Sequence, residues 1–201
     1  MVKNLLFFFV LTVSVALSAQ NESKSTEQFL NETDEKIPQL LNDFLVPGAA
    51  IALIEDGEVV SQKSYGFADI EKKTKITKKT GFNIGSISKS VAAWGVMKLV
   101  HAGKIELDVP VEKYLTRWQF PKSDFDSEGV TVRRLLSHTA GTSLHSVSAG
   151  PPYENLPTLE DWLNGKNDGL GRVELIREPG TGYKYSGGGY GVLQLLIEKV
   201  S

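Results

Sequence analysis

Residues 82–90 read Phe82-Asn83-Ile84-Gly85-Ser86-Ile87-Ser88-Lys89-Ser90, the most informative run in the chain. Gly85 precedes a segment with helical spacing, so we expect Ser86 to lie where a helix begins. Ser86 and Lys89 are three positions apart and therefore share one helix face. An amine at that spacing reaches the serine hydroxyl, a weak nucleophile at pH 7 that needs a nearby base. An N-capping serine with an exposed lysine is the alternative interpretation of these four residues alone.

Three further short motifs follow residues 82–90 along the chain. They are Leu135-Leu136-Ser137-His138-Thr139-Ala140-Gly141, then Pro179-Gly180, then Tyr185-Ser186-Gly187. Together with residues 82–90 they resemble the serine β-lactamase-related family, which includes class C β-lactamases, penicillin-binding DD-peptidases and related esterases. The resemblance runs from about residue 45 to the end of the chain. Three shorter pieces also fit it: Val46-Pro47-Gly48, Tyr65-Gly66 and Leu107-Asp108.

The resemblance implies both a fold and a set of roles. The expected fold class is α+β, β-lactamase/transpeptidase-like, with an antiparallel sheet packed with helices plus a mainly helical region. Ser86 is then the nucleophile, and its own N–H can donate to a developing oxyanion. Lys89 helps remove the serine proton, and Tyr185 shuttles a proton between nucleophile and leaving group. Tyr183 is a nearby competitor for the tyrosine role.

Two departures from the family pattern affect the expected substrate. The family triplet is Tyr-x-Asn, whereas Gly187 follows Tyr185 and Ser186 here. Ser186 and Gly187 are the expected substrate-binding positions, but glycine cannot offer a side-chain amide to a substrate acylamide. The family's later Lys/His-Thr/Ser-Gly motif is missing. Lys78-Lys79-Thr80-Gly81 contains a similar string, but it precedes Ser86, and we interpret it as a coincidence in a loop.

Composition excludes several other classes of function. The chain has 201 residues, a net charge of −2 and no cysteine, so neither nucleic-acid binding nor a cysteine metal site is supported. His138 lies in a block expected to fix a turn near the cleft, and a structural role is favoured there. His101 is expected at the end of a helix and His145 in a loop. These three histidines lack a metal-binding spacing, so we predict no metal and no cofactor.

The N-terminus has the pattern of a secretory signal. Lys3 precedes an apolar run from Leu5 to Leu17, and small residues follow. The run is shorter than the roughly 20 residues of a membrane-spanning helix. The domain prediction is a signal peptide over 1–19, a polar leader and first helix over 20–44, and a partial hydrolase domain over 45–201. We therefore expect a secreted or periplasmic protein without a stable membrane anchor after signal removal.

Local patterns predict the elements before residue 82. A helix is expected from Ser25 to Leu45, with Pro38 breaking or kinking it. Apolar runs at 49–54 and 59–67 flank Asp56-Gly57, a strong hairpin signal. Residues 69–80 are polar and are expected to form a solvated loop or edge. The apolar face expected for the first helix consists of Phe29, Ile37, Leu40, Leu41 and Phe44.

The second half is expected to be largely helical. Thr131 is the expected N-cap of a short helix, Gly103 the C-terminal cap of the helix that follows Ser86, and 188–201 a final helix. Residues 142–172 are expected to form an irregular loop region that shapes a binding site, apart from a short helical piece near Leu159 to Leu163. The stripe expected to be buried on the helix after Ser86 consists of Val91, Trp94, Leu99 and Val100. We expect the later strands of the sheet to lie outside these 201 residues.

The functional prediction is a secreted serine hydrolase that acts through an acyl-enzyme. Its substrate is a small molecule or a peptide or ester with an ester, amide or β-lactam carbonyl, and Gly187 favours esters. The alternative is a truncated, catalytically inactive remnant or a binding module of the same fold. No oligomeric state follows from the sequence.

Overall fold

The computed structural model describes residues 25–146, 157–166 and 169–201. The predicted signal segment and part of the predicted 142–172 loop lie outside these ranges. The chain divides into two compact units, residues 1–82 and 83–201. Within the described residues, no helix combines the length and apolar character needed to cross a bilayer.

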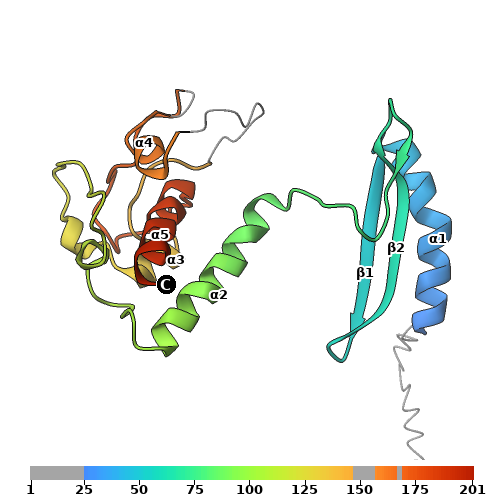
Figure 1. Ribbon diagram of the computed structural model, residues 1–201, viewed down its shortest axis with the longest axis horizontal. Helices are drawn as coiled ribbons and strands as arrows, with labels where there is room; N and C mark the ends of the chain where they lie inside the picture. Colours follow the sequence, from blue (N-terminus) through green and yellow to red (C-terminus); the bar gives the residue numbers. More distant parts are fainter. Residues whose placement is uncertain (1–24, 147–156, 167–168) are drawn as a thin grey trace, which may run out of the picture. The chain divides into compact units, whose positions relative to one another are not determined.

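The first unit is a helix packed on an antiparallel hairpin (Figure 1). Helix α1 (Thr26–Asp43) is followed by β1 (Gly48–Glu55), β2 (Glu58–Asp69) and the two-residue β3 (Thr74–Lys75), in sheet order β1-β2-β3. Asp56 and Gly57 both have positive φ and form the expected hairpin turn. Residues 69–80 thus contain an edge strand in addition to a loop.

Two predictions for α1 need correction. The helix continues through Pro38, which lacks one backbone N–H donor but does not end the helix. None of its residues is buried: Phe29 and Leu40 are exposed, as is Phe44 just after the helix, while Ile37 and Leu41 are half-buried. Asp34 on α1 accepts hydrogen bonds from the Lys63 ammonium and, at 2.7 Å, from the Tyr65 hydroxyl.

The segments Val46-Pro47-Gly48 and Tyr65-Gly66 lie side by side in the hairpin. Gly48 pairs with Gly66 across β1 and β2, and the Phe67 N–H donates to the Pro47 carbonyl at 2.8 Å. Gly66 has φ +69°, and a Cβ on it would lie 2.2 Å from the Pro47 oxygen. Only glycine allows this close approach, which explains why both segments carry one.

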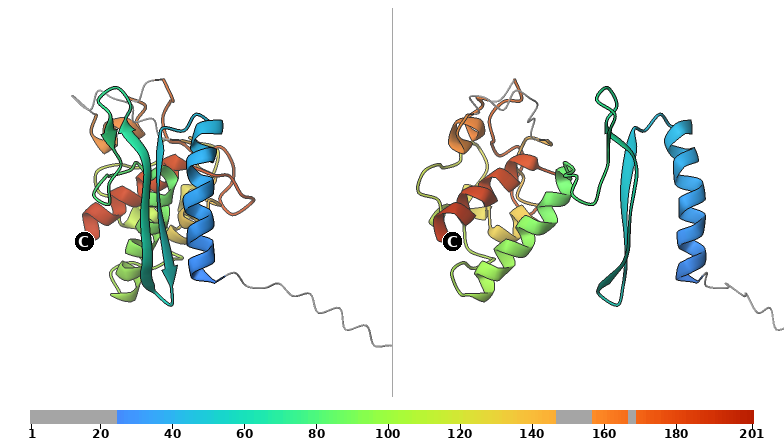
Figure 2. Two further views of the ribbon diagram at one scale, coloured as in Figure 1. Left: turned by 90° about the vertical axis from the view of Figure 1, so that its right-hand side faces the viewer. Right: turned by 45° about the vertical axis from the view of Figure 1, so that its right-hand side comes forward.

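The second unit is built around one helix. Helix α5 (Gly187–Val200) packs against α2 (Ser88–His101), α3 (Val132–Leu136) and α4 (Leu159–Leu163), as Figure 2 shows. Short 3-10 turns η1 (Gly85–Ile87), η2 (Val111–Lys113) and η3 (Ser127–Gly129) complete it. Its largest fully buried side chains are Val96, Val111, Val130, Val132, Leu135, Leu163, Val173, Val192, Leu193, Leu196 and Ser186.

Caps and ion pairs fix the loops of this unit. The Thr131 hydroxyl accepts from the Arg134 N–H, as predicted for an N-cap, and Gly103 ends α2 with φ +68°. Arg133 forms a two-armed pair with Asp108 at 2.7 and 2.8 Å. This pair ties α3 to the loop that follows α2.

The predicted stripe of α2 is partly wrong. Val96 is fully buried, and Leu99 and Val100 pack against the core, but Val91 and Trp94 are 62% and 66% exposed. A helix turns 100° per residue, so Trp94 lies about 160° around the axis from Val96. Only the Val96 side of α2 faces α5.

Candidate active site

Ser86 lies in a turn rather than in the body of a helix. Gly85 has φ +50°, and its N–H donates to the Asn83 side-chain oxygen at 2.8 Å. This turn places Ser86 within η1, directly before α2 begins at Ser88. The Ser86 side chain is exposed. N–H groups in a first helical turn lack intrahelical partners and point toward incoming negative charge.

Lys89 and Tyr185 both reach the same serine oxygen. The Lys89 ammonium donates to Ser86 Oγ at 3.1 Å, and the Tyr185 hydroxyl donates to it at 2.8 Å. The structure therefore brings together the three residues selected from the sequence. Tyr183, the alternative tyrosine, is 66% exposed and places its ring 6.0 Å from that of His138.

The surroundings of Tyr185 favour its ionised form. The hydrogen bond with Ser86 and then the Lys89 ammonium hold the pKa of the Tyr185 phenol below its ordinary value of 10.0. The Lys89 Nζ lies 5.2 Å from the centre of the Tyr185 ring and 5.6 Å from that of Tyr190. These ring faces suit a charged ammonium. A phenolate beside a serine hydroxyl can take its proton.

Three N–H donors connect the family blocks within this unit. Gly180 N–H donates to the Thr139 carbonyl, and Lys184 N–H donates to the His138 carbonyl, both at 2.8 Å. Ser186 N–H donates to His138 Nδ1 at 3.2 Å. The segment after Pro179 is thereby aligned along residues 138–139, and Tyr185 projects toward Ser86.

Ser186 has a structural position that differs from the expected substrate contact. It is 1% exposed, its Oγ accepts from the Gly189 N–H at 2.9 Å, and it donates to the Ser143 carbonyl. These bonds make Ser186 the N-cap of α5. A hydroxyl with both partners inside the protein is not available to a substrate, so we correct its role to capping.

Gly187 is also buried, against the 145–146 backbone. Its N–H donates to the His145 carbonyl at 3.1 Å, and a Cβ there would lie 3.1 Å from that oxygen. A larger residue therefore needs the neighbouring segment to move. The position that carries the family asparagine is filled here by backbone, and no side chain extends from it toward a substrate.

Two histidines flank Tyr185, and sequence reasoning gave neither a part in the site. The ring centres of His138 and His145 lie 4.4 and 4.9 Å from that of Tyr185. Tyr190 lies 5.2 Å from His138, and its hydroxyl donates to the Leu136 carbonyl at 3.2 Å. His138 directly precedes Thr139-Ala140-Gly141, so its position in a family block could have indicated a place near the site. No sequence pattern indicated such a place for His145 or Tyr190.

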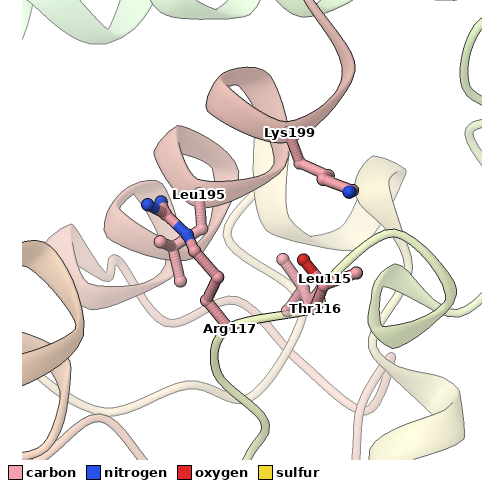
Figure 3. A pocket seen from close by; sticks show the side chains of 5 residues that line it. All are labelled: Leu115, Thr116, Arg117, Leu195 and Lys199. Atoms are coloured by element: carbon pink, nitrogen blue, oxygen red, sulfur yellow. The ribbon is translucent and has the colours of Figure 1, made fainter.

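Neither of two recesses in the described surface is lined by Ser86, Lys89 or Tyr185. Figure 3 shows one of about 10 Å³ between the 115–117 loop and α5, where roughly one water molecule fits. A larger one of about 290 Å³ is lined by Met97, Leu107, Arg133, Leu136 and Ser137. In the parts of the chain that the structure describes, no three His, Asp or Glu side chains converge to hold a metal.

A family model described as Beta-lactamase matches residues 33–201. The chain therefore belongs to the β-lactamase family and has its β-lactamase/transpeptidase-like fold.

Individual relatives agree with this assignment. Protein flp of Staphylococcus aureus (strain N315) is 28% identical over 182 residues, which are 85% of this chain and 34% of flp. The mitochondrial serine beta-lactamase-like protein LACTB of Bos taurus is 32% identical over 114 residues, which are 56% of this chain and 20% of LACTB. The chain thus spans about a third or less of the length of these curated relatives.

Solved structures show the same fold. The octameric penicillin-binding protein homologue from Pyrococcus abyssi is 31% identical with a TM-score of 0.67, over 85% of this chain and 39% of that one. EstCE1, described as a hydrolase with promiscuous acyltransferase activity, is 26% identical with a TM-score of 0.65, over 87% and 48%.

Proposed function

We propose that this chain carries the nucleophile of a serine hydrolase that works by acyl transfer, with Ser86, Lys89 and Tyr185 as its catalytic residues. One observation carries the proposal: Ser86 Oγ lies within hydrogen-bond distance of both the Lys89 ammonium and the Tyr185 hydroxyl. A nucleophile in contact with a proton acceptor and a cation is the arrangement that covalent catalysis by serine requires.

The proposed reaction has two halves. The Tyr185 phenolate takes the Ser86 proton while Ser86 Oγ forms a bond to the substrate carbonyl carbon. Tyr185 then gives that proton to the leaving alkoxide, and an acyl-serine ester remains. Water or another hydroxyl acceptor attacks this ester and passes its proton through Tyr185 back to Ser86. Lys89 keeps its charge throughout and stabilises the anionic form of Tyr185.

We favour ester substrates over β-lactams. The support is Gly187, which offers no side-chain amide to the acylamide of a β-lactam and is packed against the His145 carbonyl. EstCE1, a hydrolase with acyltransferase activity, has a similar fold. Water and an alcohol can both accept the acyl group in chemistry of this kind. We also propose that the protein is secreted or periplasmic, on the strength of the N-terminal signal pattern.

Covalent labelling of the chain with a fluorophosphonate probe tests the proposal. We expect one adduct per chain, located on Ser86 by peptide mass spectrometry and lost in Ser86→Ala. Ser88→Ala is the matched control, because Ser88 is exposed two positions away. A folded chain that takes no probe at Ser86 supports the inactive or binding form of the fold instead.

Substrate preference needs a second measurement on the same preparation. We expect a nitrophenyl ester to acylate Ser86 faster than nitrocefin does. The opposite order, with nitrocefin faster, contradicts the ester assignment and leaves the acyl-transfer assignment standing.

A further inference from the structure

His138 contacts the Tyr185 segment in three ways at once. Its backbone carbonyl accepts from the Lys184 N–H at 2.8 Å, and its ring Nδ1 accepts from the Ser186 N–H at 3.2 Å. Its ring also lies against that of Tyr185, with centres 4.4 Å apart and planes at 34°. His138 thus forms hydrogen bonds with the backbone on both sides of Tyr185 and packs against one face of its ring.

The backbone of His138 has a left-handed conformation that serves this arrangement. It has φ +58°, just after α3 ends at Leu136. Histidine and asparagine are among the few non-glycine residues that adopt this region readily. A left-handed residue turns the chain sharply, so its carbonyl and its side chain both meet the 184–186 segment.

We propose that His138 is a positioning residue for Tyr185, and that it acts only as the neutral imidazole with Nδ1 unprotonated. This inference rests on the proposed function, because it assigns a task toward the proposed proton carrier. His138 has no hydrogen bond to Ser86 among the described contacts and acts through Tyr185. When Nδ1 gains a proton it no longer accepts from the Ser186 N–H. One of the two hydrogen bonds that fix the backbone beside Tyr185 is then lost.

The groups around His138 oppose its protonation. Burial, and after it the charge of Lys89, hold the pKa of His138 below its ordinary value of 6.5. The titratable groups that face it are Lys89 from α2, Tyr190 from α5, and Tyr183 and Tyr185 from the preceding loop. His145 covers the other face of Tyr185. In the described part of the chain, none of these neighbours is a carboxylate.

The pH dependence of Ser86 labelling separates this task from a merely structural one. If labelling needs only the Tyr185 phenolate, its rate falls tenfold for each unit by which the pH is lowered, which is a slope of one on a logarithmic scale. At pH values below the pKa of His138, where that ring also becomes protonated, we expect the logarithm of the rate to fall by two for each pH unit. His138→Asn keeps an amide oxygen near the place of Nδ1 and tolerates the left-handed backbone, but it does not titrate.

We therefore expect His138→Asn to fold and to follow a slope of one down to acid pH. His138→Ala lacks the acceptor and the ring, and we expect labelling on the order of a hundredfold slower at pH 7, the scale of a small misplacement. His101→Asn, an exposed histidine at the end of α2, should leave rate and slope unchanged. An unchanged slope of two in His138→Asn overturns the proposal.

A readout without activity separates this inference from the proposed function. In the wild-type chain, imidazole ¹⁵N NMR should show His138 with its proton on Nε2, and Lys89→Met should raise its pKa toward 6.5. The protection of the Ser186 amide, its exchange rate relative to that of an unprotected amide at the same pH, should fall below the pKa of His138. If Ser86 takes no probe but these signals appear, the function fails and the arrangement of His138 stands. If the proton is on Nδ1, the inference itself fails.

Discussion

The Tyr185 hydroxyl lies 2.8 Å from Ser86 Oγ, and the Lys89 ammonium lies 3.1 Å from the same oxygen. Two donors therefore converge on one serine oxygen from different elements. Lys89 comes from α2, and Tyr185 from the loop before α5. The distance between Ser86 and Tyr185 depends on the packing of these elements. Substitutions at the site are therefore tested by labelling of Ser86, and substitutions in the packing by the free energy of unfolding.

Removal of the Tyr185 hydroxyl should slow acylation without loss of the fold. Tyr185→Phe keeps the ring against His138 but removes the phenol oxygen that is the proposed proton acceptor beside Ser86. We expect fluorophosphonate labelling about 10²- to 10⁴-fold slower, the usual contribution of a positioned acid–base group. Tyr183→Phe is the control. A larger loss in Tyr183→Phe than in Tyr185→Phe reverses the assignment of the two tyrosines.

Loss of the Lys89 charge should move the titration of Tyr185 to higher pH. Lys89 stabilises the phenolate, so Lys89→Met should raise the pKa of Tyr185 toward 10.0. NMR of ¹³C-labelled tyrosine measures this shift directly. Lys98→Met, on the exposed side of α2 over the Trp94 ring, should leave the titration unchanged. A Tyr185 titration that is the same in Lys89→Met and wild type contradicts this account.

The cap of α5 should contribute measurably to stability. Ser186→Ala removes a buried acceptor for the Gly189 N–H, and we expect the free energy of unfolding to fall by about 1–2 kcal/mol. Urea denaturation monitored by far-UV circular dichroism measures the change. Ser90→Ala, an exposed serine, should stay near the wild-type value. Equal stability of the two variants excludes the capping role.

Two glycine-to-alanine changes should have opposite signs. In Gly188 a Cβ would lie 2.8 Å from Val173 Cγ2 and 3.0 Å from the Ser143 oxygen, so Gly188→Ala should destabilise by about 1–3 kcal/mol. Gly95 in α2 has open space at that position, so Gly95→Ala should stabilise by about 0.5–1 kcal/mol. Chemical denaturation of both variants tests the pair, and a stabilising Gly188→Ala refutes the packing argument.

The link between α1 and β2 should weaken in acid. The hydrogen bonds from Lys63 and then Tyr65 hold the pKa of Asp34 below its ordinary value of 3.8. A lowered carboxyl pKa stabilises the fold above 3.8, and this contribution disappears as the pH falls through the folded value.

Asp34→Asn should therefore speed amide exchange in β2 at pH 7 and lose the extra acid sensitivity that the wild type shows below pH 3.8. Glu35→Gln, the exposed neighbour on α1, is the control. If β2 amides exchange equally in both variants, Asp34 does not hold the helix to the hairpin.

Local signals in the sequence predicted much of this fold. Asp56-Gly57 specified the hairpin turn, Thr131 the start of α3 and Gly103 the end of α2, because each acts through its own backbone or nearest neighbours. The Ser86–Lys89 contact follows in the same way from helical spacing. These features need no knowledge of distant residues.

Features that depend on distant packing were not predictable in this way. Trp94 was expected inside but is exposed, because the side of α2 that is buried depends on where α5 lies. Ser186 was expected at the substrate, and only its bonds to Ser143 and Gly189 reveal a cap. The place of His145 beside Tyr185 likewise depends on the path of a loop that carries no local signal.

The 99 positions that separate Tyr185 from Ser86 also set an order of events during synthesis. A ribosome that has released Ser86 and Lys89 has still to make the tyrosine and the helix that places it. Closing so long a loop is slow compared with winding a helix. The growing polypeptide therefore exposes Ser86 before Tyr185 exists, and the contact between the two forms only after Tyr185 and α5 have been made.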